Sequence, residues 1–225
     1  MAENIHMISQ TEENYLKAVY QLAGTEKKSV GTNAISERMN TAPASVTDMI
    51  RRLAGKELLN YEKYKGVSLT SDGNKHATQL IRKHRLWEVF LVSNLNFGWD
   101  QVHDIAEQLE HIQSDELIQR LDAYLGNPRF DPHGDPIPNA EGKFMLRNQH
   151  PIGDISPGHT VILIGVRTHE TPFLEYLNSL EIGLGKEIEI LEKISFDNSL
   201  KIRINNKIET IISEKVSQDL LVRRK

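Results

Sequence analysis

The sequence contains no cysteine among its 225 residues. This absence excludes a disulfide framework, a thiolate zinc site and a cysteine nucleophile. Any metal ion must therefore be held by oxygen and imidazole nitrogen. Long hydrophobic runs are also missing, since no stretch reaches the roughly 18 apolar residues that a membrane span requires. The first residues lack the basic and apolar regions of a secretion signal, so we predict a cytoplasmic protein with no membrane partner.

The net charge of −4 includes two large blocks of opposite sign that nearly cancel. Residues 27–85 carry 12 basic and 5 acidic side chains, whereas residues 86–145 carry 3 basic and 11 acidic ones. A net charge of +7 followed by −8 indicates an anionic partner for the first block and a cationic partner for the second.

The N-terminal pattern predicts three helices followed by a hairpin. Ser9 and Glu12 have the spacing of a capping box at the start of the first helix, and Gly24 ends it. A short second helix and a third over residues 44–54 follow, and Lys65-Gly66 separates two strand-like runs. This order within a basic block is typical of a winged helix-turn-helix that binds double-stranded DNA.

The third helix is the expected reading element, and the hairpin is the expected wing. Hydroxyls and arginines on the helix suit phosphate contacts, although a solvated helix surface has a similar composition. The predicted DNA-binding residues are Ala44, Ser45, Thr47, Asp48, Arg51 and Arg52 on the helix, with Lys63 and Lys65 on the wing.

Further helices are expected from Ser71 to about Leu95, over about residues 100–112, and from Ser114 to Gly126. A proline-rich stretch over residues 127–158 reads as an irregular connection. Strands are expected at 160–166, 187–194 and 200–205, with a short helix at 171–180. The expected fold is mainly α with a β-rich tail, divided into domains at 1–73, 74–147 and 148–225.

Metal-ligand residue types recur at helical spacing in the acidic block. On a helix over residues 100–112, four of them would share one face, and a further i, i+4 pair on the preceding helix would face the same cluster. Such a pair alone can simply stabilise a helix surface. Carboxylates and imidazoles suit Mn²⁺ or Fe²⁺, with Zn²⁺ and Co²⁺ as possible substitutes. The four are His103, Glu107, Glu110 and His111, and the pair is His84 and Glu88.

Four strings carry a family resemblance: APASVTDMIRRL, RKHRLWEVFL, VHDIAEQLEHIQSDEL and FDPHGDPIP. With the β-rich tail, they resemble the diphtheria toxin repressor family of metal-dependent transcriptional regulators, in particular its manganese-responsive branch. The resemblance implies a winged helix-turn-helix domain, a helical dimerisation and metal-binding domain, and a C-terminal SH3-like small β-barrel.

The resemblance also implies two sets of metal ligands. The family carries cysteine in some members where this chain has Glu107 and Asp131, which favours manganese here. Asn14 stands where the manganese branch has aspartate, so that either Asn14 or Glu13 supplies the ligand, and Lys17 argues against a closely spaced pair of metals. The implied primary ligands are Asn14, Glu107, Glu110 and His111, and the implied ancillary ligands are His84, Glu88, His103, Asp131, His133 and Glu170.

The implied function is that of a homodimeric repressor of metal-uptake genes, activated by Mn²⁺ or Fe²⁺ and bound to a palindromic operator. Three alternatives remain at this point: an iron-responsive member of the family, a metal-independent winged-helix regulator, and a carboxylate-bridged metalloenzyme. The last requires Glu-x-x-His pairs on two helices. Glu88 and Glu107 lack such a partner, so we expect no enzymatic activity.

Overall fold

The structure is a computed structural model that describes residues 8–24, 27–62 and 65–225. The chain forms two compact units, and each unit is built from three separate segments of the sequence. The first comprises Met1–His84, Leu109–Ser114 and Pro138–Lys143, and the second comprises Arg85–Gln108, Asp115–Ile137 and Phe144–Lys225. Within the described ranges, every helix is too short or too polar to cross a bilayer.

The first unit begins with α1 (Gln10–Ala23), α2 (Thr32–Arg38) and α3 (Pro43–Gly55). The predicted capping box is present, because the Ser9 hydroxyl accepts from Glu12 N and the Glu12 carboxylate accepts from Ser9 N. Pro43 lies in the first turn of α3, where no backbone N–H is needed. The three predicted helices are confirmed.

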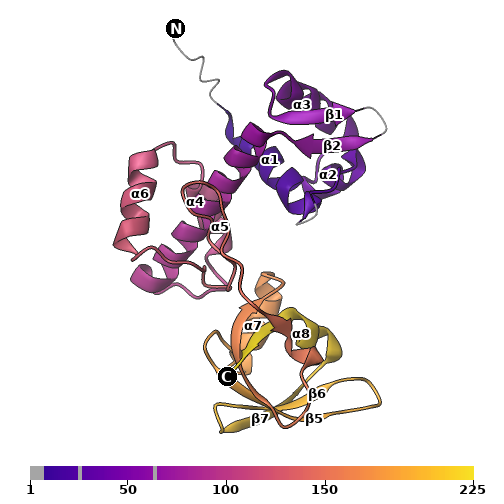
Figure 1. Cartoon of the computed structure of the whole chain (residues 1–225), viewed down its shortest axis with the longest axis vertical. Coiled ribbons are helices and arrows are strands. Elements are labelled where there is room, and N and C mark those ends of the chain that lie inside the picture. The colour runs from indigo at the N-terminus through magenta and orange to yellow at the C-terminus, as the bar shows by residue number, and fades with distance from the viewer. Residues whose placement is uncertain (1–7, 25–26, 63–64) are drawn as a thin grey trace. The chain divides into compact units, whose positions relative to one another are not determined.

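The predicted hairpin is also confirmed, as the antiparallel pair β1 (Leu59–Glu62) and β2 (Gly66–Leu69). Val67 additionally bridges to Val30, which ties the hairpin to the segment before α2. Figure 1 shows the hairpin beside α3. Apolar side chains from all these elements close one core, which includes Leu16, Ile35, Val46, Ile50 and Val67.

Helix α4 (Ser71–Leu95) begins in the first unit and continues into the second. Helix α6 (Asp115–Tyr124) is close to its prediction, but α5 (His103–Leu109) is shorter than expected. Gln101 N donates to Gly98 O before α5, and Ile112 N donates to Leu109 O after it, so turns replace the predicted helical ends. Glu110 and His111 follow α5, and the prediction that they share a helical face with His103 and Glu107 is wrong.

The proline-rich connection contains an ordered tight loop over residues 130–136, which the sequence had suggested would be irregular. Phe130 and Pro136 pair across it. Asp131 Oδ1 accepts from His133 N at 2.8 Å and from Asp135 N at 2.9 Å. Gly134 supplies the turn with a φ of 91°. These bonds fix the backbone of the loop.

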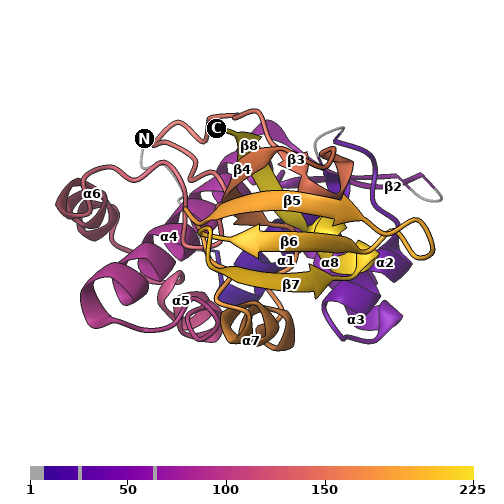
Figure 2. The ribbon, with the colours of Figure 1, turned by 90° about the horizontal axis from the view of Figure 1, so that it is seen from below.

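The tail of the second unit is a six-stranded antiparallel sheet in the order β3-β8-β4-β5-β6-β7. The predicted strands are present, whereas β3, β7, β8 and α8 were not predicted. Figure 2 shows β5, β6 and β7 side by side. The bounds are β3 (His150–Pro151), η1 (Ile152–Asp154), β4 (Thr160–Val166), α7 (Thr171–Ser179), β5 (Glu187–Lys193), β6 (Leu200–Ile204), β7 (Ile208–Ile212), α8 (Glu214–Asp219) and β8 (Leu220–Arg224).

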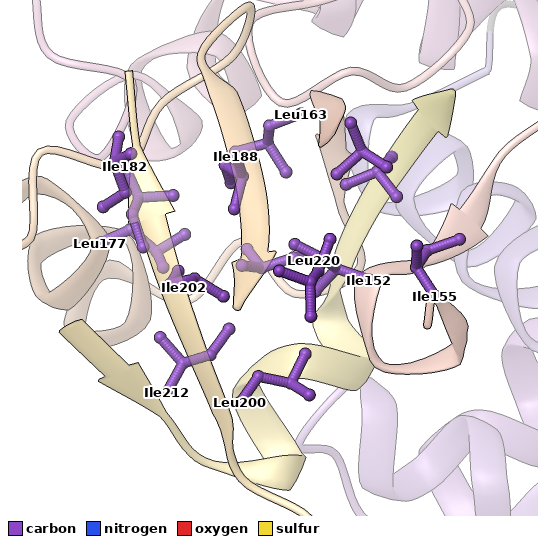
Figure 3. Packing of buried hydrophobic residues seen from close by; sticks show 14 of the residues in the cluster. Ile152, Ile155, Leu163, Leu177, Ile182, Ile188, Leu200, Ile202, Ile212 and Leu220 are labelled. Carbon is purple, nitrogen blue, oxygen red and sulfur yellow. The ribbon is translucent and has the colours of Figure 1, made fainter. Parts of the chain in front are cut away.

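The concave interior of this sheet holds the largest apolar cluster of the described chain. Leu163, Ile188 and Ile202 alternate with less buried residues along their strands. Together with Leu220 they gather inside the sheet (Figure 3). α7 contributes Leu177 to the same cluster. This core supports β4, which in turn pairs with the loop over residues 130–136 through Val166 N and His133 O.

Candidate metal centre

Glu88, Asp131 and His133 form a buried group of potential metal ligands in the second unit. Each offers one ligand atom, and these atoms all lie within 4.8 Å of one another. Glu88 projects from α4, whereas the other two belong to the loop over residues 130–136. The exposed fractions of the three residues are 2%, 5% and 1%, so water does not screen the charges from one another. We call Glu88, Asp131 and His133 the metal centre.

His133 presents a nitrogen to this centre that suits a cation. Its Nε2 lies 2.7 Å from the carbonyl of Trp99, which identifies Nε2 as the donor. Its Nδ1 is buried, has no hydrogen-bond partner among the described residues and lies 3.7 Å from Glu88 Oε1. An imidazole nitrogen left unpaired between carboxylates is what a divalent metal requires. The residues present therefore fit a divalent ion.

The electrostatics of the centre reflect crowded negative charge. Burial, followed by the charges of Glu88 and Asp135, raises the pKa of Asp131 to about 7. Burial lowers the pKa of His133, but Glu88 and Asp131 outweigh burial and raise it to about 9. A proton on His133 thus stabilises the carboxylates, and a bound cation would take over this role.

Several neighbours orient the centre. Arg85 Nε lies 3.3 Å from Asp131 Oδ2, and its Nη2 lies 2.6 Å from Asp135 Oδ2. His103 Nδ1 lies 3.8 Å from Glu88 Oε1. The ring of His169 stacks on His133 with a centroid distance of 4.5 Å, and burial together with the charge of His133 lowers its pKa to about 4. Reasoning from the sequence missed Arg85 and His169, since neither has a ligand-like spacing.

A second polar cluster lies in the first unit around Glu110. Lys17 Nζ lies 2.9 Å and 2.7 Å from the two Glu110 oxygens, and His84 Nδ1 lies 2.6 Å from Oε2. Burial favours the neutral acid, but His84 and Lys17 outweigh burial and hold the pKa of Glu110 below its ordinary value. The cluster already contains an ammonium cation.

Glu13, not Asn14, reaches the implied primary ligands. His111 Nδ1 lies 2.6 Å from Glu13 Oε2, and Gln113 Nε2 donates to Glu13 Oε1 at 2.8 Å. Glu13 is buried, whereas Asn14 is exposed. The second of the two predicted possibilities is therefore the one whose side chain faces His111.

Two further implied ligands lie apart from these clusters. The Glu107 side chain is 52% exposed, and its nearest imidazole is His103 Nε2 at 3.6 Å. Glu170 is exposed at the N-cap of α7. The structure thus brings together Glu88, His103, Asp131 and His133 in the second unit, and His84 with Glu110 in the first.

The predicted DNA-binding residues occupy the outer face of α3. Ala44, Ser45, Asp48, Arg51 and Arg52 are exposed, whereas Val46, Ile50 and Leu53 are buried. Thr47 is half-buried, and its hydroxyl donates to Pro43 O. Lys65 is exposed in the hairpin turn, and Lys63 lies outside the described residues.

Comparison with protein families divides the chain into three matched parts. The N-terminal DNA-binding domain of iron-dependent repressors matches residues 7–67. Their metal-binding and dimerisation domain matches residues 70–139, and an FeoA domain matches residues 150–224. These matches confirm the expected fold class, with its helical domains and SH3-like β tail.

Individual relatives agree with these matches. The diphtheria toxin repressor of Corynebacterium jeikeium is 33% identical over 133 residues, which cover 58% of this chain but only 54% of that relative. An HTH-type transcriptional regulator of Methanocaldococcus jannaschii is 31% identical over 118 residues, covering 52% of this chain and 94% of the relative.

Among solved structures, a manganese-dependent transcriptional repressor in complex with manganese is 31% identical. It superimposes with a TM-score of 0.81 over 95% of this chain and 100% of that chain. The matched family is one of DNA-binding, metal-dependent transcriptional repressors, not of enzymes. By fold, matched domains and relatives, this chain belongs to the diphtheria toxin repressor family of metal-dependent transcriptional repressors.

Proposed function

We propose that this chain is a Mn²⁺-activated, dimeric repressor of metal-uptake genes. The observation that carries the proposal is the buried metal centre, in which an imidazole nitrogen without a hydrogen bond among the described residues faces two carboxylates. The working division into domains remains 1–73 for DNA binding, 74–147 for dimerisation and metal binding, and 148–225 for the SH3-like part.

Manganese is the preferred metal because the centre offers only hard oxygen and imidazole ligands. The solved relative with manganese supports this choice. Iron remains the second candidate, since the matched domains are described as those of iron-dependent repressors. Zn²⁺ and Co²⁺ would bind the same ligand types.

The metal centre joins two elements that are far apart in the sequence. A divalent ion would supply positive charge that both carboxylates share. Glu88 would hold α4, while Asp131 and His133 would hold the loop over residues 130–136 in one arrangement. Ligands from separate elements realise their full binding energy only in that arrangement, so occupancy would favour it over others. His84, Glu110, His111 and Glu13 would form the second, Lys17-containing site.

For the DNA side, we propose that α3 of each protomer enters the major groove. Two protomers would then read the half-sites of a palindromic operator about one helical turn apart, or a multiple of that distance. Arg51 and Arg52 would neutralise phosphates, which positions the helix without specifying sequence.

The test is a gel-shift titration of a selected operator with and without Mn²⁺. We expect the unaltered chain to bind the operator tightly only with Mn²⁺. The variant Glu88→Gln keeps the shape of the side chain but removes its charge, and it should bind weakly both with and without Mn²⁺. Glu175→Gln, at an exposed position on α7, is the matched control and should behave like the unaltered protein. Equal affinity with and without metal in the unaltered chain would overturn the proposal.

A further inference from the structure

A basic cavity lies on the SH3-like part, within the second unit. Its volume is about 560 Å³, which falls within the range of small-molecule sites. The residues that define its character are Phe130, Arg147, His150, Ile164, Arg223 and Arg224. No carboxylate is among the described residues that line it.

Arg147 is held in place as part of the cavity wall. Its Nη2 donates to the carbonyl oxygens of Gly134 and Ile164, and its Nε donates to Gln149 Oε1 at 3.3 Å. The guanidinium also lies 4.0 Å from the ring centroid of Phe130. A guanidinium fixed in this way loses little conformational entropy when it receives a ligand.

Arg223 and Arg224 bring two more positive charges to the end of β8. Both are exposed, and neither has an ion pair within the described part of the chain. The next residue differs, because Lys225 Nζ lies 2.8 Å from Glu187 Oε1. The charges of Asp131 and Asp135 partly offset that of Arg147, whereas Arg223 and Arg224 repel each other, and an anion between them would relieve this repulsion.

We propose that this cavity binds a small anion carrying two or more negative charges, of the phosphate or carboxylate class. Arginine forks match the oxygen atoms of both groups. The concave shape favours a small molecule over a DNA backbone, which needs an extended surface. The proposal is independent of the function proposed above, because none of these residues is assigned to metal or operator binding.

The experiment is calorimetric titration of the metal-free full-length chain with pyrophosphate and, separately, with citrate, at constant ionic strength. We expect a Kd between about 10 µM and 1 mM for at least one of them. The double variant Arg223→Gln/Arg224→Gln should bind at least about tenfold more weakly. Lys225→Gln removes a neighbouring charge outside the cavity and should bind as the unaltered chain does.

The two probes identify the class of anion. Binding of pyrophosphate alone assigns phosphate, and binding of citrate alone assigns carboxylate. The backbone NMR signals of Phe130 and Ile164 should shift in either case, and circular dichroism checks that the variants fold. The proposal is overturned if neither probe binds at about 10 mM, if the double variant binds equally well, or if Lys225→Gln loses as much affinity.

Discussion

At the scale of single residues, Lys17 controls the charge of the Glu110 cluster. Its ammonium contacts both Glu110 oxygens and lies 3.4 Å from His84 Nδ1. It therefore occupies the position that a divalent ion bound to Glu110 would need. Two cations so close in a buried site repel strongly, so a metal ion at Glu110 must first displace Lys17.

Lys17→Met should therefore have opposite effects without and with metal. Without metal, it leaves the buried Glu110 carboxylate without its ammonium, at a cost of about 3 kcal/mol. With Mn²⁺, the variant should gain more stability than the unaltered chain, as measured by urea unfolding. Lys56→Met breaks a similar pair with buried Glu12 and should show no extra gain. Equal gains in both variants would contradict the role given to Lys17.

Gly134 offers a second prediction at this scale, because its environment leaves no room for a side chain. An added Cβ would lie 2.1 Å from Ile164 O, and its φ is 91°. Gly134→Ala should cost several kcal/mol and weaken Mn²⁺ binding, since the loop carrying Asp131 and His133 must move.

Gly126→Ala is the matched control for this prediction. Gly126 has a φ of 78° but nothing within 4 Å of the added Cβ. This variant should lose about 1 kcal/mol and keep its Mn²⁺ affinity. Thermal unfolding measures the stability, and metal titration measures the Mn²⁺ affinity. Similar losses in the two variants would refute the argument that the lack of room for a Cβ at Gly134 causes the effect.

At the scale of elements, the outer face of α3 predicts how operator binding depends on salt. Arg52→Ala should weaken operator binding. It should also lower the slope of the logarithm of the binding constant against the logarithm of the salt concentration by about 0.9, the value for one phosphate contact. Fluorescence anisotropy at several salt concentrations measures it. Arg120→Ala, at an exposed position on α6, should leave the slope unchanged, and an unchanged slope in Arg52→Ala would remove this residue from the interface.

The start of α1 predicts a pH dependence of stability. Burial tends to raise the pKa of Glu12, but Lys56 and Ser9 outweigh burial and hold it below the ordinary 4.5. A carboxylate with a lowered pKa stabilises the fold above its unfolded pKa, and this contribution is lost as the pH falls through the folded value.

Glu12→Gln should therefore be less stable than the unaltered chain at pH 6, with a difference that shrinks as the medium is acidified below 4.5. Urea unfolding at a series of pH values measures it. Glu37→Gln, at an exposed position on α2, should show no such trend. If the difference in stability between Glu12→Gln and the unaltered chain grew as the pH fell, the pKa of Glu12 could not be lowered in the folded state.

Local sequence signals were sufficient for most elements but not for the ends of α5. Capping, periodicity and turn residues act within one helical turn, and they predicted α1, α3 and the hairpin. The periodicity of residues 100–112 could not show that Glu110 would bond to Lys17 and His84, nor His111 to Glu13. Glu110 and His111 make these bonds at the positions where the helix was expected to continue.

At the scale of the whole molecule, the candidate site depends on contacts that no local pattern contains. Glu88 was predicted as a ligand from its helical spacing, whereas Asp131 and His133 were predicted through the family resemblance, and the structure places the three together. His169 comes from the SH3-like part and was missed, because only the folded sheet brings its ring onto His133. The net charge of each segment predicted an anionic and a cationic partner, whereas the total charge of −4 predicted neither.

Removal of metal should lower the stability of the whole chain. A ligand that binds only the native state stabilises it by about 2.7 kcal/mol at a concentration one hundred times its Kd. Unfolding temperatures should therefore rise with Mn²⁺ concentration and fall after chelation. Glu88→Gln should abolish the rise, and Glu175→Gln should retain it. A rise that persists in Glu88→Gln would mean that the stabilising ion binds elsewhere.

The composition of the first unit has a consequence for dissecting the protein. Leu109–Ser114 and Pro138–Lys143 belong to the same compact unit as the N-terminal residues, and Leu109–Ser114 supplies partners of Glu13 and Lys17. A fragment that stops at residue 73 would carry α1, α2, α3 and the hairpin, yet it would expose Glu13 and Lys17, whose partners it lacks. We therefore expect residues 1–73 to fold poorly when expressed alone or fused to another protein, although the division expected from the sequence falls at residue 73.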